Sequence, residues 1–285
     1  MTVSSTEQPM FATYPSLRGR TAFVSSGASG LGAEFVSQLA GQGVRVAFID
    51  IDLDRGKALE QALRDDGADA LFAECDVRDV SALQAAIARS AEQLGPIRVL
   101  VNNAANDHRD KVAEMDQARW DDRIAVNLRH HFFAAQAVAE MMRDAGGGSI
   151  INLGSISAHI DLMDLPGYIT AKAGIEGLTR TLAREYGRWH IRVNCIIPGW
   201  VMTEKQVTEW VTPEAEESIA RNQCLPDKLY PDDVARLLLW LAADDSRSCT
   251  AQRWIGTEAG CEYQGREIHR PLHLPRRGPV LGRCS

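Results

Sequence analysis

The amino-acid sequence predicts an α/β fold in which one domain is built on a doubly wound, parallel β-sheet. Short apolar runs alternate with longer segments of helical period, the pattern of parallel strands joined by crossover helices. Two of the runs, Val-Arg-Val-Ala-Phe-Ile and Val-Asn-Cys-Ile-Ile, are almost continuously apolar, as expected for strands covered on both faces. With 285 residues, 45% of them hydrophobic, the chain can bury a large core in a single domain.

Strands and helices are expected to alternate from Thr21 to Ile255. The strands are expected at Thr21–Ser25, Val44–Ile49, Ala70–Glu74, Val99–Asn102, Ser149–Leu153, Arg192–Ile197 and Arg253–Ile255. The main helices between them are expected at Leu31–Ala40, Leu53–Arg64, Val80–Leu94, Leu128–Met142, Tyr168–Tyr186 and Val234–Ala242.

The two ends of the chain differ in character from the part between them. Residues 1–15 read as a flexible lead, and residues 16–261 as the folded domain. Residues 262–285 form a basic tail with five Arg against two Glu, three Pro and little periodicity. We expect no fold for this tail.

Charge and composition exclude several classes of partner. The net charge of −7 and the pI near 5.5 argue against binding of nucleic acid or an anionic membrane, since either needs a basic face. No stretch approaches the ~18 apolar residues of a membrane span, and no secretory signal is recognisable, so a cytoplasmic protein is expected. Six scattered cysteines without metal-ligand spacing predict reduced thiols and no metal site. A small-molecule partner is favoured.

A glycine-rich turn follows the first strand and opens directly into a helix. Its sequence is Ser25-Ser26-Gly27-Ala28-Ser29-Gly30-Leu31-Gly32. Glycine permits positive φ and close approach of the backbone to a ligand, and the N–H groups at a helix start attract a pyrophosphate. We therefore assign Ser26, Ser29, Gly30, Leu31 and Gly32 to a cofactor site. The alternative is a tight strand-to-helix turn without a ligand.

Asp50 strengthens the cofactor interpretation. It ends the second strand, about twenty residues after the turn, where a carboxylate accepts hydrogen bonds from the adenosine ribose hydroxyls. Its negative charge would repel a 2'-phosphate, which favours NAD over NADP. The nearby Arg45 and Arg55 keep NADP open as the alternative.

Tyr168 and Lys172 lie four residues apart at the start of an expected helix, so their side chains emerge on one face. A free tyrosine has a pKa of about 10, and a neighbouring ammonium favours its phenolate. Ser155, at the carboxyl end of a strand, could hydrogen-bond the reacting oxygen. The alternative for an isolated Tyr-x-x-x-Lys is a packed ring beside a solvated lysine.

Together these motifs resemble the short-chain dehydrogenase/reductase family. The likeness covers residues 17–260 and rests on the order and spacing of the glycine-rich turn, Asn102-Asn103-Ala104, Asn127, Ser155, Tyr168, Lys172 and Pro198-Gly199. It implies a Rossmann-like fold, a nicotinamide cofactor and a homotetramer. It also implies a proton-relay tetrad: Tyr168 takes the proton of the substrate hydroxyl, Ser155 holds the oxygen, Lys172 lowers the Tyr168 pKa and binds ribose, and Asn127 positions a water.

The same resemblance implies further cofactor contacts. Asp76 and Val77 would flank the adenine, Asn103, Ala104 and Ala105 the middle of the cofactor, and Pro198, Gly199, Val201 and Thr203 the nicotinamide, in addition to Tyr168 and Lys172.

Three positions depart from the family pattern. Ser26 stands where glycine is usual, which puts the shape of the turn and the cofactor affinity in doubt. Ala105 replaces the glycine of Asn-Asn-Ala-Gly and adds a methyl group near the cofactor. The segment Gly256–Gly260 also differs from the usual ending.

Within the family, the chain resembles NAD-dependent aldose 1-dehydrogenases of the D-xylose dehydrogenase kind. The likeness rests on Tyr14-Pro15-Ser16-Leu17, Asn106-Asp107-His108-Arg109, Asn127-Leu128-Arg129-His130 and Gly154-Ser155-Ile156-Ser157-Ala158-His159. It implies oxidation of the anomeric hydroxyl of a sugar to a lactone. The candidate substrate residues are Asn106, Ser157, His159, Asp164 and Trp200.

Two other interpretations share these motifs. One is the same chemistry on another secondary alcohol or ketone, because variable loops decide specificity on a shared scaffold. The other is a non-catalytic dinucleotide-binding scaffold. The altered turn and tail favour this interpretation, whereas the intact tetrad argues against it. For Asp107–Asp110, the alternative to a substrate contact is an exposed charged loop.

Overall fold

The computed structural model describes residues 11–160, 162–209, 211–212, 217, 225 and 227–255. They form the predicted doubly wound fold, with one seven-stranded parallel sheet in the order β3-β2-β1-β4-β5-β6-β7. The predictions made for residues 1–10, for Gly256–Gly260 and for the tail at 262–285 lie outside the described residues.

All seven expected strands are confirmed, with ends that differ by two residues at most. Their bounds are β1 Thr21–Ser25, β2 Arg45–Asp50, β3 Ala70–Glu74, β4 Ile97–Asn102, β5 Gly148–Leu153, β6 Ile191–Ile197 and β7 Arg253–Ile255.

The six expected helices are confirmed, and the described residues contain two shorter ones outside that set. The expected helices are α1 Gly30–Gly41, α2 Leu53–Asp65, α3 Val80–Leu94, α5 His130–Asp144, α6 Pro166–Tyr186 and α9 Pro231–Ala242; the others are α4 Gln117–Ile124 and α7 Glu204–Glu209. Neither α4 nor α7 contains a buried residue, so neither carries the apolar stripe by which a sequence reveals a helix. Instead, the side chain of Asp116 caps α4 by accepting a hydrogen bond from the Arg119 N–H.

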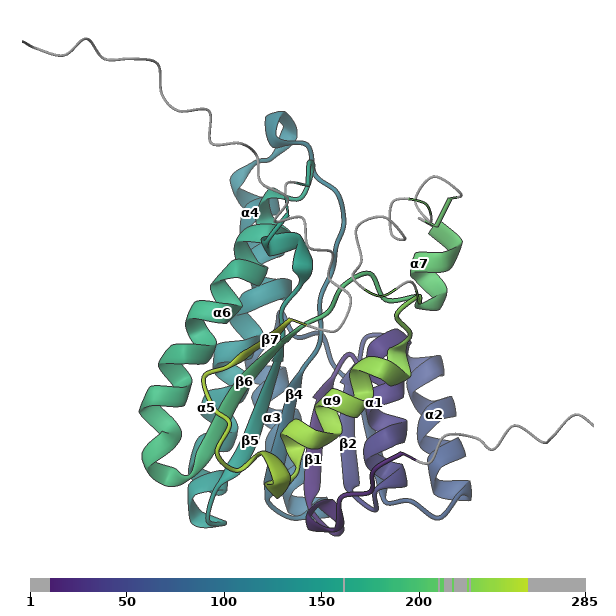
Figure 1. The fold of residues 1–285 in the computed structure, drawn as a ribbon, viewed down its shortest axis with the longest axis vertical. Coiled ribbons are helices and arrows are strands. Elements are labelled where there is room, and N and C mark those ends of the chain that lie inside the picture. The colour runs from purple at the N-terminus through teal and green to yellow at the C-terminus, as the bar shows by residue number, and fades with distance from the viewer. Residues whose placement is uncertain are drawn as a thin grey trace, which may run out of the picture.

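Helices cover both faces of the sheet, and alternate strand residues supply two cores. Val24 and Val101 pack with α1 and α9 on one face, whereas Phe23 and Leu100 pack with α3 and α5 on the other. Figure 1 shows α1 and α9 crossing the strands on one side, with α5 and α6 on the other. Among the described residues, the helices are all too short or too polar to cross a bilayer.

The strand order reverses between β1 and β4. The chain lays down β1, β2 and β3 in one direction and then returns to place β4 on the other side of β1. In open parallel sheets, ligands bind at such a switch point, beyond the carboxyl ends of the strands. The turn after β1 and the Asn102-Asn103-Ala104 segment at the end of β4 therefore meet at this point.

A buried polar network fixes the elements beneath the switch point. Asn152 of β5 accepts a hydrogen bond from Asn102 Nδ2 of β4 at 2.9 Å and donates one to Thr179 Oγ1 of α6 at 3.0 Å. His131 Nδ1 of α5 lies 3.3 Å from the same Asn152 oxygen, and His130 Nε2 lies 3.1 Å from the Ala104 carbonyl oxygen. Burial lowers the pKa of His130 to about 3, so this ring is neutral. Two strands and two helices are thus held in register by side chains.

The packing of α2 against β3 generates a stability prediction. Gly56 faces the Phe72 ring so closely that a methyl group there would overlap it. We expect Gly56→Ala to lower the free energy of unfolding by ~1–3 kcal/mol, as overpacking does. Gly41→Ala is the matched control, because Gly41 ends α1 and a Cβ there meets nothing within 4 Å. Urea unfolding of both variants measures the effect, and equal stabilities would contradict it.

Candidate active site

The glycine-rich turn between β1 and α1 is tied to the end of β4. The Ser25 hydroxyl accepts hydrogen bonds from the N–H groups of Asn103 at 3.0 Å and Ala104 at 3.1 Å. The Asn103 amide donates to the carbonyl oxygens of Ser25 at 3.3 Å and Ser26 at 3.0 Å. Two segments assigned separately to the cofactor are therefore joined into one surface, and the neighbouring Ala105 is exposed beside it.

Ser26 occupies a left-handed backbone conformation, with φ of +53°. Glycine adopts this conformation most easily, which explains why it is usual at this position. The Ser26 hydroxyl donates to Asp50 Oδ2 at 3.3 Å, and the same oxygen accepts from the Ala28 N–H at 3.0 Å. Asp50 Oδ1 accepts from the Asp52 N–H at 3.1 Å. The buried Asp50 carboxylate thus stabilises the turn, and its contact with a ribose stays a prediction.

The first turn of α1 presents bare backbone. Ser29 is its N-cap residue, yet its side chain makes no capping hydrogen bond. Gly30 has φ of +53°, and a side chain on Gly32 would overlap the Ser26 carbonyl oxygen. A Cβ on Gly30 would lie 3.6 Å from Thr203 Cγ2, so the loop after β6 approaches this turn. Leu31 packs against the core and fixes the helix start.

This arrangement fits a nicotinamide dinucleotide. The uncapped N–H groups and the dipole of α1 suit a pyrophosphate, and the Asp50 carboxylate at the end of β2 suits a ribose diol. The group itself supplies the hydride chemistry when bound.

Asp76 and Val77 follow β3 at the expected edge of the sheet. Val77 is buried, and the Asp76 carboxylate accepts hydrogen bonds from Arg78 Nε at 2.9 Å and Nη2 at 2.6 Å. The hydrogen bond from Arg78 lowers the pKa of Asp76 against the opposing effect of burial. Arg78 also binds Asp122 of α4. The structure therefore gives Asp76 a partner within the protein, and its contact with adenine stays a prediction.

The loop after β6 reaches the same edge of the sheet. The Pro198 carbonyl oxygen accepts a hydrogen bond from the Ile156 N–H at 3.1 Å, next to Ser155. Gly199 follows, and Val201 pairs with Leu229 as an isolated parallel bridge. The Thr203 hydroxyl accepts a hydrogen bond from the Gln206 N–H at 3.3 Å and so caps α7.

Tyr168 and Lys172 emerge from the first turns of α6, which begins at Pro166. Lys172 is almost fully buried, and its Nζ donates to the Leu153 carbonyl oxygen at 2.7 Å. The same nitrogen lies 5.5 Å from the centre of the Tyr168 ring. The structure thus brings together Tyr168, Lys172 and the end of β5, where Ser155 stands.

The pKa values of this pair differ from the simple expectation. Burial raises the pKa of Tyr168 to about 12, and the Ser155 hydrogen bond that lowers it is only a partial offset. Burial likewise lowers the pKa of Lys172 to about 8. The Lys172 ammonium donates to the Leu153 carbonyl oxygen and faces the Tyr168 ring, and the lowering of the Tyr168 pKa by Lys172 stays a prediction.

Asn127 lies in a π-helical segment, Ala125–Arg129, between α4 and α5. Such segments interrupt α-helices most often at functional sites. The buried Asn127 side chain accepts from the Asn106 N–H at 2.8 Å and donates to the carbonyl oxygens of Asn106 at 3.1 Å and Arg123 at 3.0 Å. Asn127 therefore positions the loop after β4, and its relay water stays a prediction.

Ser157 contacts the catalytic candidate Ser155 directly. Its hydroxyl donates to Ser155 Oγ at 2.7 Å, and its N–H donates to the same atom at 3.2 Å. With these two hydrogen bonds accepted, the Ser155 proton is directed toward another acceptor. Ser157 was assigned to the substrate from sequence; its contacts in the structure are with Ser155, and its contact with a substrate stays a prediction.

The other substrate candidates divide into two groups. Asn106 is hydrogen-bonded to Asn127 of the tetrad. Trp200, in the loop after β6, donates from Nε1 to Gln206 Oε1 of α7 at 2.9 Å. His159 Nε2 instead lies 2.7 Å from Glu176 of α6, which also binds Arg253 of β7 at 2.9 Å. That ring nitrogen is thus engaged within the protein.

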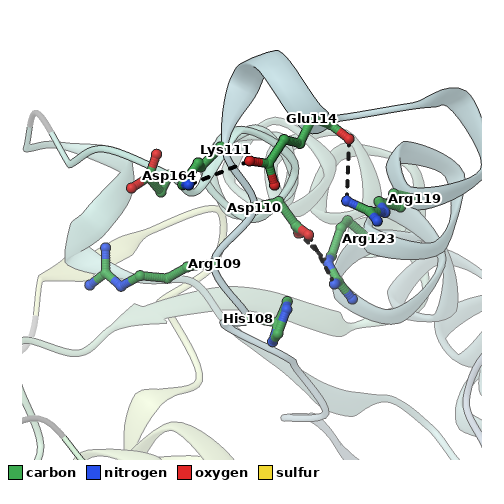
Figure 2. Close-up of a pocket in the computed structure, with 8 residues that line it drawn as sticks. All are labelled: His108, Arg109, Asp110, Lys111, Glu114, Arg119, Arg123 and Asp164. Atoms are coloured by element: carbon green, nitrogen blue, oxygen red, sulfur yellow. Dashed lines mark hydrogen bonds and ion pairs between the residues drawn. The ribbon is translucent and has the colours of Figure 1, made fainter.

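Asp164 lines a polar pocket of about 380 Å³ with its φ at +61°. The pocket is lined by His108, Arg109, Asp110, Lys111, Glu114, Arg119, Arg123 and Asp164 (Figure 2). Its wall includes the buried ion pair between Arg123 and Asp110 at 2.6 Å. The tetrad residues are not among those that line it, so the contact of Asp164 with a substrate stays a prediction.

Sequence reasoning passed over Lys205 and Gln206 of α7, which contact Asp107 in the loop after β4. Asp107 was left between a substrate contact and an exposed loop, and its position just beyond β4 was the available signal. Among the described residues, His, Cys, Asp and Glu side chains are nowhere grouped in threes as metal ligands would be.

Comparisons with known proteins agree with this geometry. Residues 27–256 match a family model described as enoyl-(acyl carrier protein) reductase. The chain is 47% identical over 245 residues to a D-xylose 1-dehydrogenase of Caulobacter vibrioides, covering 86% of this chain and 97% of that protein. It is 44% identical over 243 residues to a protein named probable galactose dehydrogenase GalD of Rhizobium meliloti, covering 85% and 95%.

A solved structure with the same architecture is a 7α-hydroxysteroid dehydrogenase complexed with NADH and 7-oxo glycochenodeoxycholic acid. It has a TM-score of 0.82 and 27% identity, over 86% of this chain and 96% of that one.

The buried Lys172 ammonium generates a prediction on stability and pH. Because its pKa is about 8 in the folded protein and about 10.4 in an unfolded chain, the unfolded state binds more protons between these values. The contribution of Lys172 to stability should therefore rise with pH across this window, by about 2–3 kcal/mol between pH 7.5 and pH 10. Cys75, Cys195 and Tyr168 contribute in the opposite direction, because burial raises their pKa values, so the effect of Lys172 is the difference between the protein with and without it.

In Lys172→Met this rise should be absent, while in Lys57→Met, at an exposed position on α2, it should persist. Denaturant unfolding at several pH values measures it. Parallel pH profiles for Lys172→Met and the unaltered protein would show that Lys172 is not the group responsible.

Proposed function

The chain belongs to the short-chain dehydrogenase/reductase family, and from this premise we propose that it oxidises the anomeric hydroxyl of an aldose to the lactone with NAD. The oxidoreductase class and the use of a nicotinamide dinucleotide follow from the family. The observation that carries the sugar is the 47% identity to a D-xylose 1-dehydrogenase over 97% of that protein's length. Another secondary alcohol is the alternative, favoured by the likeness to a hydroxysteroid dehydrogenase.

The residues of this chain handle the proton and the oxygen of the reaction. Ser155, oriented by Ser157, donates a hydrogen bond to the reacting oxygen and holds it near Tyr168. Tyr168, whose neutral form is favoured by burial, takes the hydroxyl proton once its own proton has been released, while the anomeric carbon gives up its hydride, so a C=O bond forms as the O–H and C–H bonds break. Lys172, with its pKa near 8, exchanges a proton in the working pH range. Asn127 holds the loop that carries Asn106 and Asp107.

NAD is favoured over NADP by the position of Asp50. The buried carboxylate stands at the end of β2, where a 2'-phosphate would meet its charge. Arg55 of α2 pairs with Asp52 and Glu204, each at 3.6 Å, and Arg45 donates to the Gly19 carbonyl oxygen at 2.7 Å, so both nearby cations have partners within the protein.

Assembly and location complete the proposal. Homotetramer formation is supported by the apolar side chains of Trp120 on α4 and Phe132 on α5, which are exposed in the single chain. A cytoplasmic location is supported by the reduced cysteines expected from the sequence.

The test of function is NADH production from D-xylose, L-arabinose, D-glucose and D-galactose, compared with Tyr168→Phe. We expect turnover of at least one aldose, and a loss of roughly 10²- to 10⁴-fold in kcat when the phenol hydroxyl is removed. Tyr186→Phe, on the same helix but stacked on Trp189, is the matched control. A silent sugar panel together with oxidation of a hydroxysteroid would replace the aldose by another alcohol, and full activity of Tyr168→Phe would refute the proton relay.

Cofactor preference is tested by Asp50→Asn. Removal of the charge should lower the ratio of kcat/KM for NAD to kcat/KM for NADP by roughly 10- to 100-fold, since a hydrogen bond to a charged group is lost and a repulsion relieved. Asp52→Asn makes the same change at the N-cap of α2 and should leave the ratio unaltered. An unchanged ratio in Asp50→Asn would exclude Asp50 as the determinant.

A further inference from the structure

A hydrogen-bonded cluster joins the loop after β4 to the short helix α7. Lys205 Nζ lies 2.5 Å from Asp107 Oδ1, and Gln206 Nε2 donates to Asp107 Oδ2 at 3.1 Å. Trp200 Nε1 donates to Gln206 Oε1 at 2.9 Å, which extends the cluster to the loop after β6. Figure 1 shows α7 standing apart from the helices that cover the sheet, so this contact is a tether between loops.

The Asp107 carboxylate lies beside the catalytic residues. Its neighbour Asn106 is bound by Asn127 of the tetrad through both its N–H and its carbonyl oxygen. The negative charge of Asp107 raises the pKa of both Tyr168 and Lys172, in each case as a smaller cause than burial. The carboxylate is thus within electrostatic reach of both groups, and the Asn106–Asn127 hydrogen bonds place its loop against the tetrad.

The contacts of Asp107 keep it ionised and oriented. Burial alone would raise its pKa, but the hydrogen bond and charge of Lys205 outweigh burial, so the pKa of Asp107 lies below its usual value. The side chain remains one-third exposed. An ionised carboxylate accepts up to about four hydrogen bonds, so those from Lys205, Gln206 and the backbone of Asp107 itself leave room for another. A hydroxyl group is a ligand that matches such a carboxylate.

We propose that Asp107, held by Lys205 and Gln206, is a specificity-determining residue that accepts a hydrogen bond from a sugar hydroxyl on a carbon away from the anomeric centre. The inference rests on the proposed aldose dehydrogenase function. A polyhydroxylated substrate satisfies the carboxylate when the site excludes water, whereas a substrate without that hydroxyl leaves a desolvated charge without this partner. Asp107 thereby selects sugars over simple alcohols.

The test pairs Asp107→Asn with a series of deoxy sugars. For the unaltered protein, kcat/KM with NAD is measured for the best-used aldohexose and its 2-deoxy, 3-deoxy and 4-deoxy analogues. We expect kcat/KM for one or two of the analogues to be roughly 10- to 100-fold below that of the parent sugar, which is the effect of losing a hydrogen bond to a charged group. In Asp107→Asn, kcat/KM for the parent sugar should fall by a similar factor, mainly through a higher KM. For the analogues that were already poor substrates, the substitution should lower kcat/KM little further.

Glu209→Gln is the matched control, because it removes a carboxylate from an exposed position on α7, the helix that carries Lys205 and Gln206. It should retain the parent pattern. Titration of NADH fluorescence in Asp107→Asn should give an unchanged Kd, which reports a folded cofactor site independently of the sugar.

Two outcomes would overturn the inference, and they are distinguishable. If the unaltered protein oxidises aldoses but Asp107→Asn lowers kcat/KM for the parent and every analogue by one common factor, Asp107 only holds α7 in place and the proposed function survives. If the unaltered protein turns over no aldose, the proposed function and this inference both fail.

Discussion

The buried network centred on Asn152 is the constraint on which the site depends. Asn152 joins β4, β5 and α6 through Asn102 and Thr179, with His131 of α5 against the same oxygen. Ser155 comes three residues after Asn152, and Tyr168 and Lys172 lie on the helix that carries Thr179. A buried polar group that loses its hydrogen-bond partner is costly in free energy, so this network restricts how far β5 and α6 can shift relative to each other. The network thereby restricts the distances between Ser155, which follows β5, and the Tyr168 and Lys172 side chains on α6.

Next to this network, the protein buries the two ionisable side chains of the proposed proton relay, Tyr168 and Lys172. Lys172 is enclosed with the Leu153 carbonyl as its hydrogen-bond partner, and Tyr168 is held in a setting that favours its neutral form. Both shifts come chiefly from burial, which disfavours the charged state of each group. Near neutral pH the burial of the Lys172 ammonium consequently works against stability, as functional sites often do. Ser155 and Asp107 then adjust the Tyr168 pKa in opposite directions.

The cofactor half shows how one departure from a family pattern is accommodated. Ser26 keeps the left-handed backbone of the glycine it replaces, and its hydroxyl binds Asp50. Asp50 also accepts a hydrogen bond from the Ala28 N–H, so a single buried carboxylate stabilises the turn in addition to its proposed contact with the ribose. A side chain that would strain the turn on its own is compensated by a hydrogen bond that glycine lacks.

The sequence by itself determined the sheet, the six long helices and the pairing of Tyr168 with Lys172, because apolar periodicity and a four-residue helical spacing are local properties. It did not reveal α4 or α7, whose residues bury no apolar stripe. Only the tertiary structure decided that Ser157 serves Ser155, that Glu176 engages His159, and that Asp107 meets Lys205 and Gln206 nearly a hundred positions later. Those contacts arise where strand ends and loops from distant parts of the chain converge, and no local pattern encodes which side chains face one another there.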